Sequence, residues 1–295
     1  MLEACPPITP YLKYPGGKRR LVPQIAQYYE PYRQSSRFVD LFCGSAAVSL
    51  GLRPVVALLN DACRPLIGLH RWVQRGWGNA SESGGYWVNF ENDKAVYYKN
   101  RDRFNQLIAR GLDWTLEAGL LLYYLNRTGF NGLMRFSKSG VYNVPYGHYR
   151  KISYCENFSR WRSPMQGWEF TSADFTAVQL APTDFVYADP PYDSVKNSGF
   201  EQLSLLGIEH QGGSGHGFVG YSGAFGWGDQ VRLAQYLAQH SGPALVSNAA
   251  THRVVQLYQD LGFEVTELGV RRSISCKGDR PLVQEIFAFK EGHHG

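Results

Sequence analysis

The residues best suited to chemistry form the segment Asp189-Pro190-Pro191-Tyr192, which directly follows the apolar, β-forming residues 185–188. This pattern predicts a buried strand that ends in a rigid loop, because proline fixes φ at about −65° and lacks a backbone donor. The loop would offer a carboxylate, carbonyl oxygens and a flat ring at the end of a strand, where ligands bind in α/β folds. Such groups suit a planar amine, for example a nucleobase taken out of its stack. The alternative is an ordinary Pro-Pro turn with a surface tyrosine.

A second candidate site lies in residues 38–50. The sequence predicts a short strand ending at Asp40, a turn of small residues around Gly44 and a helix from Ala46 onward, as in a nucleotide-binding α/β fold. The segment lacks the Gly-x-Gly-x-x-Gly spacing of a pyrophosphate-binding turn, so we expect a nucleoside ligand without phosphates. A second predicted strand, residues 55–59, ends just before Asp61, which is placed to accept the two ribose hydroxyls. The alternative for Asp61 is an N-cap of the helix predicted over residues 64–73.

The elements that position these sites begin with the turn-rich residues 11–18, which precede an apolar spacing typical of a helix. Gly16 and Gly17 permit close backbone approach to a ligand, and Lys13 and Lys18 could face an anion or a carboxylate. A surface loop with a Gly-Gly turn is the alternative. Further helices are predicted over residues 95–110, 116–125, 229–240 and 254–261, and strands over residues 244–247, 264–270 and 283–289.

Positive charge is concentrated in one part of the chain. Residues 126–162 hold seven basic residues and one acid, whereas the formal net charge of the whole chain is +5. Aromatic residues alternate with these charges, and Ser139-Gly140 predicts the turn of a β-hairpin, a shape that enters DNA grooves. Because basic side chains contact phosphates and rings contact bases, this segment predicts a nucleic-acid-binding surface. A solvated basic face is the alternative.

Length and composition define the class of protein. With 295 residues and 44% hydrophobic content, the chain can bury a full core as one large domain with an insertion, or as two domains. No stretch approaches the roughly 18 apolar residues of a membrane span, and the first ten residues do not resemble a signal peptide, so we expect a cytoplasmic protein with no membrane partner. The five cysteines are scattered and form no Cys-x-x-Cys pair, which predicts free thiols. His210 and His216 lack partners at ligand spacing, so we expect no metal.

The chain resembles the Dam-like (D12-class) DNA adenine-N6 methyltransferases over nearly its whole length, in blocks that follow the family's order. These blocks are Lys13-Tyr14-Pro15-Gly16-Gly17-Lys18, Phe38-Val39-Asp40-Leu41-Phe42-Cys43-Gly44, Asn126-Arg127 through Asn143-Val144-Pro145, Asp189-Pro190-Pro191-Tyr192 and Val270-Arg271-Arg272-Ser273-Ile274-Ser275. The resemblance implies an α/β, Rossmann-like methyltransferase core with a mixed, mostly parallel sheet and an inserted helical and β-hairpin DNA-recognition domain. The cofactor half would be residues 1–65, the recognition domain residues 66–163 and the catalytic half residues 164–295.

The resemblance also assigns a cofactor and catalytic roles. It implies that S-adenosylmethionine binds to Tyr14, Lys18, Phe42, Gly44, Asp61, Asp174 and Phe175. Asp189 and the carbonyl of Pro190 would accept hydrogen bonds from the target amine, and Tyr192 would stack on the flipped base. Two such hydrogen bonds direct the nitrogen lone pair toward the methyl group, so transfer needs positioning and electrostatics and no covalent intermediate.

The resemblance further implies that double-stranded DNA is the partner. Lys13, Leu133, Arg135 and Pro145 lie at positions that contact bases in GATC-specific members, and Phe130 matches an aromatic residue that inserts into the duplex. Because arginine to guanine is the commonest specific major-groove contact, Arg135 is the leading specificity residue. His148 departs from the family, which carries a DNA-reading arginine at that position. The complete predicted DNA-contact set is Lys13, Phe130, Asn131, Leu133, Arg135, Pro145, His148, Tyr149, Arg150 and Lys151.

We therefore expect site-specific adenine-N6 methylation of duplex DNA, within GATC, by a bacterial or phage protein that acts as a monomer or weak dimer. A role in restriction–modification, in marking a host chromosome or in a phage fits this sequence equally. One alternative is methylation of cytosine or an RNA base, against which Asp189 argues, since Ser or Asn would stand in its place. Another is a catalytically silent DNA-binding homologue. Residues 197–228 depart from the family, and their Gly-rich part, residues 205–217, predicts a mobile lid segment.

Overall fold

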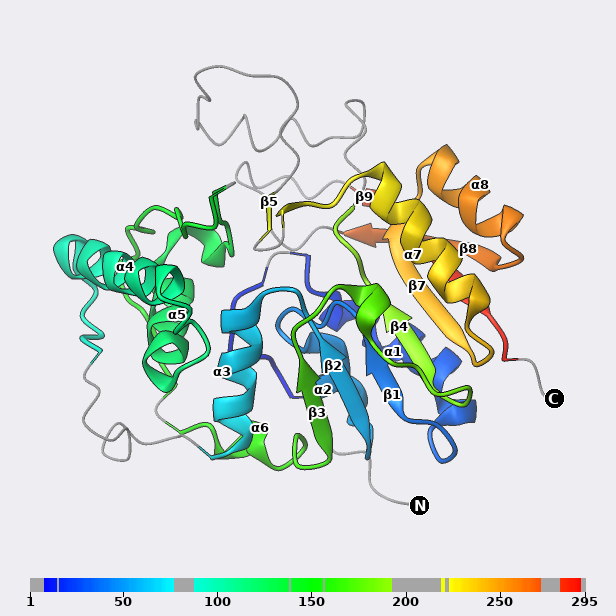
Figure 1. Cartoon of the computed structure of the whole chain (residues 1–295), viewed down its shortest axis with the longest axis horizontal. Coiled ribbons are helices and arrows are strands. Elements are labelled where there is room, and N and C mark those ends of the chain that lie inside the picture. The colour runs from blue at the N-terminus through cyan, green and yellow to red at the C-terminus, as the bar shows by residue number, and fades with distance from the viewer. Residues whose placement is uncertain are drawn as a thin grey trace.

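The centre of the protein is a seven-stranded sheet with the order β3-β2-β1-β4-β7-β9-β8 (Figure 1). It is seen in a computed structural model that describes residues 8–14, 16–76, 88–137, 139–155, 157–192, 219–220, 223–271 and 282–292. The five neighbouring strands β3, β2, β1, β4 and β7 pair in parallel, whereas β9 runs antiparallel to both β7 and β8. The predicted α/β fold with a mixed, mostly parallel sheet is therefore confirmed. The strands are β1 (Phe38–Asp40), β2 (Ala57–Asn60), β3 (Trp168–Thr171), β4 (Phe185–Ala188), β7 (Ala244–Ala249), β8 (Glu264–Arg271) and β9 (Leu282–Lys290).

Helices cover both faces of the sheet, because successive strand side chains point to opposite faces. On one face, Val39 and Val186 pack in a cluster with Leu233 and Leu237 of α7. On the other face, neighbouring strand residues belong to a cluster that includes α1, α2, α3 and α5. The helices are η1 (Lys18–Leu21), α1 (Val22–Tyr29), η2 (Glu30–Tyr32), α2 (Ala47–Leu52), α3 (Arg64–Gln74), α4 (Lys94–Ala109), α5 (Leu116–Thr128), η4 (Phe130–Gly132), α6 (Ser159–Arg162), η5 (Phe175–Ala177), α7 (Trp227–Gln239) and α8 (His252–Asp260).

The helices α4 and α5 lie beside the sheet, where α5 packs against α3 (Figure 1). Each begins at a residue that satisfies free backbone N–H groups, as N-caps do. The Asp93 carboxylate accepts from two N–H groups of the first turn of α4, and the Thr115 hydroxyl accepts from one in α5. The segment after α5 folds back through two isolated antiparallel bridges, Gly129 to Tyr146 and Phe136 to Tyr142. The predicted hairpin is thus present without regular strands.

Some predicted elements differ from the structure. The strand predicted from Val55 begins only at Ala57, and Val55 and Val56 are exposed. The edge strand β3 and the short helix α6 were not predicted; β3 alternates buried and exposed residues over only four positions. The predicted lid, residues 205–217, lies outside the described residues. Of the wider segment 197–228, the structure describes the small antiparallel pair β5 (Val219–Gly220) and β6 (Gly223–Ala224) and the residues from Phe225 that lead into α7.

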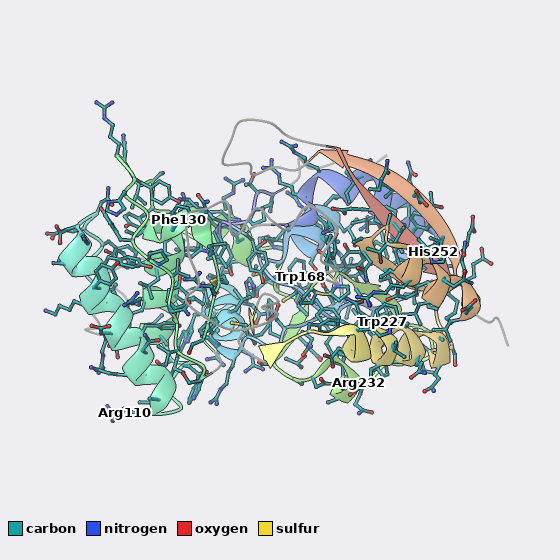
Figure 2. All side chains as sticks on the ribbon, turned by 90° about the horizontal axis from the view of Figure 1, so that it is seen from above. Arg110, Phe130, Trp168, Trp227, Arg232 and His252 are labelled. Atoms are coloured by element: carbon teal, nitrogen blue, oxygen red, sulfur yellow. The ribbon has the colours of Figure 1, made fainter. Side chains whose placement is uncertain are left out.

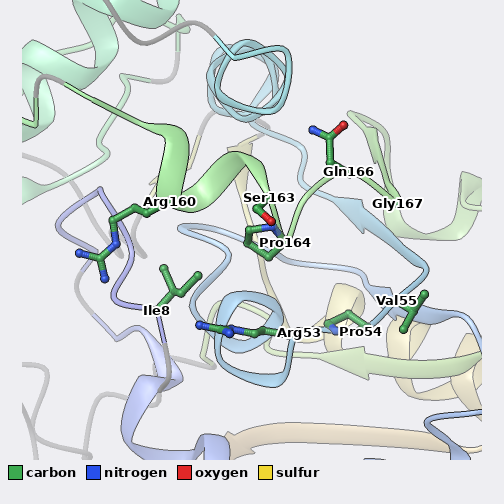
Figure 3. A pocket seen from close by; sticks show the side chains of 9 residues that line it. All are labelled: Ile8, Arg53, Pro54, Val55, Arg160, Ser163, Pro164, Gln166 and Gly167. Atoms are coloured by element: carbon green, nitrogen blue, oxygen red, sulfur yellow. The ribbon is translucent and has the colours of Figure 1, made fainter. Parts of the chain in front are cut away.

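A pocket of about 820 Å³ opens at the amino ends of the parallel strands, the edge opposite to the strand ends discussed below (Figure 3). Pro54 and Val55 line it just before β2, and Gly167 lines it just before β3. Arg53 and Arg160 give it a basic wall.

Candidate active site

Polar residues gather at the carboxyl ends of the central parallel strands. Asp40 ends β1, Asn60 ends β2 and Asp189 directly follows β4. The strand β1 pairs with β2, the next strand in the chain, on one side and with β4 on the other. This is a topological switch point, where open α/β sheets bind ligands.

The turn after β1 is tightly packed. Gly44 has φ +48°, and a Cβ on it would lie 2.9 Å from Cε1 of Tyr14, so only glycine fits here. The Asp61 carboxylate accepts hydrogen bonds from the N–H groups of Gly44, at 2.9 Å, and of Cys63, at 2.8 Å. The structure therefore brings together Tyr14, Gly44 and Asp61 of the predicted cofactor set.

The position of Asp61 excludes one of its two sequence interpretations. The N-cap of α3 is Cys63, which makes no side-chain capping bond, so Asp61 is not the N-cap itself. Each Asp61 oxygen accepts one backbone N–H, and a carboxylate oxygen has room for a second donor. Burial raises the pKa of Asp61, and the hydrogen bonds from Cys63 and Gly44 limit the rise.

A buried histidine that sequence reasoning missed supports the same turn. His70 of α3 donates from Nε2 to the carbonyl of Gly44 at 2.8 Å, and its Nδ1 accepts from the hydroxyl of Tyr11. Burial lowers the pKa of His70 to about 4, so the ring is neutral at physiological pH. A lone histidine in a helix gave no sequence signal for this contact.

Aromatic rings surround the end of β1. Phe42 and Phe175 lie with ring centroids 5.6 Å apart, and Phe225 lies 5.7 Å from Phe42. Arg232 of α7 donates to Asp174 at 2.9 Å and lies 5.0 Å from the ring centre of Phe175; Figure 2 labels both Arg232 and Trp227 on this helix. The predicted Phe42, Asp174 and Phe175 are thus brought together, with Phe225 and Arg232 as additions.

The loop after β4 is joined to the start of the chain by an ion pair. Nζ of Lys18 lies 2.9 Å from Oδ1 of Asp189 and 3.9 Å from Glu285 of β9. The same ammonium lies 4.7 Å from the ring centre of Tyr192. Burial raises the pKa of Asp189 to about 6, and Lys18 limits the rise. Lys18, predicted to contact the cofactor, therefore contacts the predicted catalytic carboxylate.

Asp40 is a second buried carboxylate at this edge. It is 2% exposed, and Oγ of Ser49 donates to it at 3.0 Å. Burial raises its pKa to about 7, although the Ser49 hydrogen bond opposes the rise.

One group of predicted DNA-contact residues clusters near Lys13. Its ammonium donates to the carbonyl of Arg127 at 3.0 Å and lies 3.9 Å from the ring centre of Tyr149. The Tyr149 hydroxyl accepts from the N–H of Asn131, and the N–H of Phe130 donates to the carbonyl of Pro145. Figure 2 shows Phe130 on the α4–α5 side of the molecule.

The N-terminal segment is held to this cluster by Asn126, which sequence reasoning named only within a family block. Its fully buried amide exchanges two hydrogen bonds with the backbone of Lys13, at 2.9 and 2.8 Å. It also donates to the carbonyl of Gly132 at 3.0 Å. One side chain therefore sets where Lys13 lies relative to the segment after α5.

The remaining predicted DNA contacts differ in exposure. Arg135 is half-buried and donates to the side chain and backbone carbonyls of Asn143, at 2.7 and 3.0 Å. Leu133 is buried, so its side chain is not on the open surface. His148, Arg150 and Lys151 are exposed, and His148 has φ +51°.

No group of three or more His, Cys, Asp or Glu in the described ranges could hold a metal ion. Among these residues we also find no helix long and apolar enough to cross a membrane. Cys43, Cys63 and Cys155 are free thiols.

Fold and site together place an Asp-Pro-Pro-Tyr loop and a tight strand-end turn at the edge where open α/β sheets bind ligands. The chain belongs to the D12 class N6 adenine-specific DNA methyltransferases, because the model of that family matches residues 14–212. It is thus an adenine-specific DNA methyltransferase that uses a methyl donor and acts on DNA.

Named relatives agree with this family. The chain is 29% identical to the DNA N-6-adenine-methyltransferase of Escherichia phage P1 over 90% of its length, although it spans only 33% of that larger protein. It is 28% identical to the retron Ec67 DNA adenine methylase of Escherichia coli, covering 94% of this chain and 90% of the relative. It is also 28% identical to the DNA adenine methylase of Escherichia coli strain K12, covering 96% and 95%.

Proposed function

We propose that this protein transfers a methyl group from S-adenosylmethionine to N6 of an adenine flipped out of duplex DNA, within GATC. The observation that carries the proposal is the position of Asp189. It follows β4 at the sheet edge where Asp61 accepts from the N–H of Gly44, and Lys18 lies in contact with it at 2.9 Å. This arrangement supports a methyl-donor site and an amine-binding carboxylate at one edge of the sheet.

The residues present fit S-adenosylmethionine. Asp61 keeps an acceptor position on each oxygen, which suits a pair of ribose hydroxyls. Phe42 and Phe175 offer aromatic surface for an adenine, and Asp174 adds a carboxylate beside them. The cofactor supplies a methyl group on a sulfonium. No Gly-x-Gly-x-x-Gly turn is present at 42–51, in keeping with a ligand that has no pyrophosphate.

Catalysis then rests on positioning the target amine. The Asp189 carboxylate and the carbonyl of Pro190 would each accept one amine proton, which leaves the nitrogen lone pair facing the donor. Tyr192 would hold the base by stacking, which contributes about 1–3 kcal/mol and so offsets an unstacking cost of a few kcal/mol. The ionised form of Asp189 is the better acceptor, and it prevails above its pKa of about 6.

Sequence recognition is assigned to the segment after α5. Asn143 holds two nitrogens of Arg135, which fixes the plane of a guanidinium whose remaining donors suit guanine. The exposed Arg150 and Lys151 suit phosphates. Lys13 and Phe130 lie on the same connected cluster.

The test measures transfer of radiolabelled methyl from S-adenosylmethionine to duplexes with and without GATC. We expect label only in GATC duplexes, recovered as N6-methyladenine, and loss of transfer in Asp189→Ala. The exposed Asp102→Ala on α4 is the control and should keep full activity. Label in duplexes without GATC would refute the specificity, and an active Asp189→Ala would refute the assigned role of Asp189.

A further inference from the structure

Two buried amide side chains form a chain of hydrogen bonds that reaches the loop of residues 189–192, here called the catalytic loop. Gln230 lies in the first turns of α7 and Asn248 lies near the end of β7, and neither side chain is exposed. Nε2 of Gln230 donates to the carbonyl of Pro191 at 2.8 Å, and Nδ2 of Asn248 donates to Oε1 of Gln230 at 2.9 Å. Oδ1 of Asn248 accepts from the N–H of Ala249 at 2.8 Å.

The Pro191 carbonyl and the Ala249 N–H, at the two ends of this chain of hydrogen bonds, determine which way each amide side chain is turned. The Pro191 carbonyl only accepts, so Gln230 must turn its NH₂ group toward it. The Gln230 oxygen then faces Asn248, which must present its own NH₂ group, and the Asn248 oxygen meets the donor of Ala249. Reversing either amide would set acceptor against acceptor or donor against donor in a buried place, which is costly.

The catalytic loop needs such an external support. Pro190 and Pro191 have no N–H groups, so the loop between Asp189 and Tyr192 cannot donate backbone hydrogen bonds at these positions. The carbonyl of Pro191 lies between the two residues assigned to the target base. A bond to this carbonyl therefore limits how Asp189 and Tyr192 move relative to each other.

We propose that Gln230 and Asn248 are positioning residues, which hold the Pro191 carbonyl and through it the geometry of Asp189 and Tyr192 for methyl transfer. This inference rests on the proposed roles of those two residues. Neither amide touches the reacting atoms in this arrangement. Their effect is on kcat, because a misplacement of about 1 Å at the reacting centre can lower a rate by roughly 100-fold.

The test compares Gln230→Met, which removes both hydrogen bonds at similar volume, with Gln230→Glu, which keeps the acceptor toward Asn248 and loses the donor toward Pro191. Both should lower kcat at saturating DNA and S-adenosylmethionine by about 10- to 100-fold, with cofactor affinity by calorimetry near that of the wild type. Gln74→Glu is the matched control, since Gln74 also donates to backbone carbonyls, those of Met165 and Trp168, at the far end of α3. It should keep wild-type kcat.

A pH profile separates positioning from general loss of structure. A buried glutamic acid that is protonated carries an O–H donor and restores the bond to Pro191. The kcat of Gln230→Glu relative to wild type at each pH should therefore rise as the pH falls, whereas that of Gln230→Met should stay flat. Wild-type kcat in both variants, or an equally flat ratio for Glu and Met, would overturn the inference. If Asp189→Ala were itself fully active, the proposed function would fail instead.

Discussion

Nζ of Lys18 and Oδ1 of Asp189 lie 2.9 Å apart, and this ion pair joins the Gly-Gly-Lys turn near the start of the chain to the loop after β4. Lys18 is only 7% exposed and also lies 3.9 Å from Glu285 of β9. The Lys18 ammonium thus lies near two carboxylates, those of Asp189 and Glu285, in a largely buried place where charge interactions are weakly screened. The protonation of Asp189 therefore depends on Lys18.

Replacing Lys18 should shift the pH dependence of methylation. Wild-type kcat should rise with pH through the Asp189 pKa of about 6, because the ionised carboxylate accepts the amine proton. Lysine lowers this pKa, so Lys18→Met should move the acidic limb of the profile to higher pH by about 1 unit. The measurement is kcat from about pH 5 to 9 at saturating substrates.

The exposed Lys94→Met on α4 is a suitable control and should leave the limb unmoved. The pH midpoint of the acidic limb does not depend on the maximal kcat. The midpoint therefore reports on Asp189 even if Lys18→Met is a slow enzyme. An acidic limb that stays in place would show that Asp189 does not control the profile.

The free energy of unfolding should depend on pH through Asp40. Burial raises its pKa to about 7 in the folded state, so the folded protein holds this proton more tightly than the unfolded chain. The stabilisation is complete below about pH 4 and is lost as the pH rises through about 7. Asp40→Asn removes the ionised form and keeps an acceptor for Ser49. The free energy of unfolding of this variant minus that of the wild type should therefore increase by roughly 1–4 kcal/mol from pH 5 to pH 8. Urea unfolding of both proteins at pH 5 and pH 8 gives the two free energies. If their difference were the same at both pH values, Asp40 would not be the source of the pH dependence.

Gly44 and Gly111 form a matched pair for testing the cofactor turn. Both have positive φ, +48° and +67°, but a Cβ on Gly111 would meet nothing within 4 Å, whereas one on Gly44 would meet the ring of Tyr14. Gly111→Ala should lower the free energy of unfolding by about 1–2 kcal/mol, the cost of the left-handed backbone, and leave cofactor affinity unchanged. Gly44→Ala should cost more and weaken S-adenosylmethionine binding by about tenfold or more.

Thermal unfolding and calorimetric titration measure the two effects. Gly44→Ala should cost less stability in a Tyr14→Ala background than in the wild type, because the ring that the new methyl group meets is then absent. Equal stability loss in the two single variants would argue against the contact with Tyr14 as the cause.

The sequence predicted the sites where a local pattern carries the information. An apolar run that ends at Asp189, or at Asp40 before the Gly44 turn, places a polar residue at a strand end, and parallel strands bring such ends to one edge. The same reasoning failed for Val55, which belongs to an apolar run but lies exposed before β2. Burial depends on where a strand begins, and the run alone does not fix that.

The contacts between side chains could not be predicted in this way. His70 reaches Gly44, and Gln230 reaches Pro191, only because separate elements fold against each other. Lys18 was assigned to the cofactor because its block is typical of the family, and the spacing of residues says nothing about Asp189 across the sheet. Such pairings follow from tertiary structure, which one sequence does not encode locally.

Base reading should separate from phosphate binding in the segment after α5. Arg135→Ala should lower the preference for the cognate guanine by about 1–3 kcal/mol, because a bidentate arginine contact is lost. Asn143→Ala should give a smaller loss, since it removes only the side-chain acceptor at 2.7 Å that orients Arg135 and leaves the backbone acceptor in place. The measurement is binding of cofactor-loaded enzyme to a GATC duplex and to duplexes with single base changes.

Lys151→Ala is the control for this comparison, because Lys151 is exposed and suited to a phosphate. It should weaken binding to every duplex by a similar factor and lower the slope of log affinity against log salt by about 1. Arg135→Ala should instead flatten the differences between duplexes. If Arg135→Ala weakened all duplexes equally, Arg135 would be a phosphate contact, and the exposed His148 would become the next residue to test for base reading.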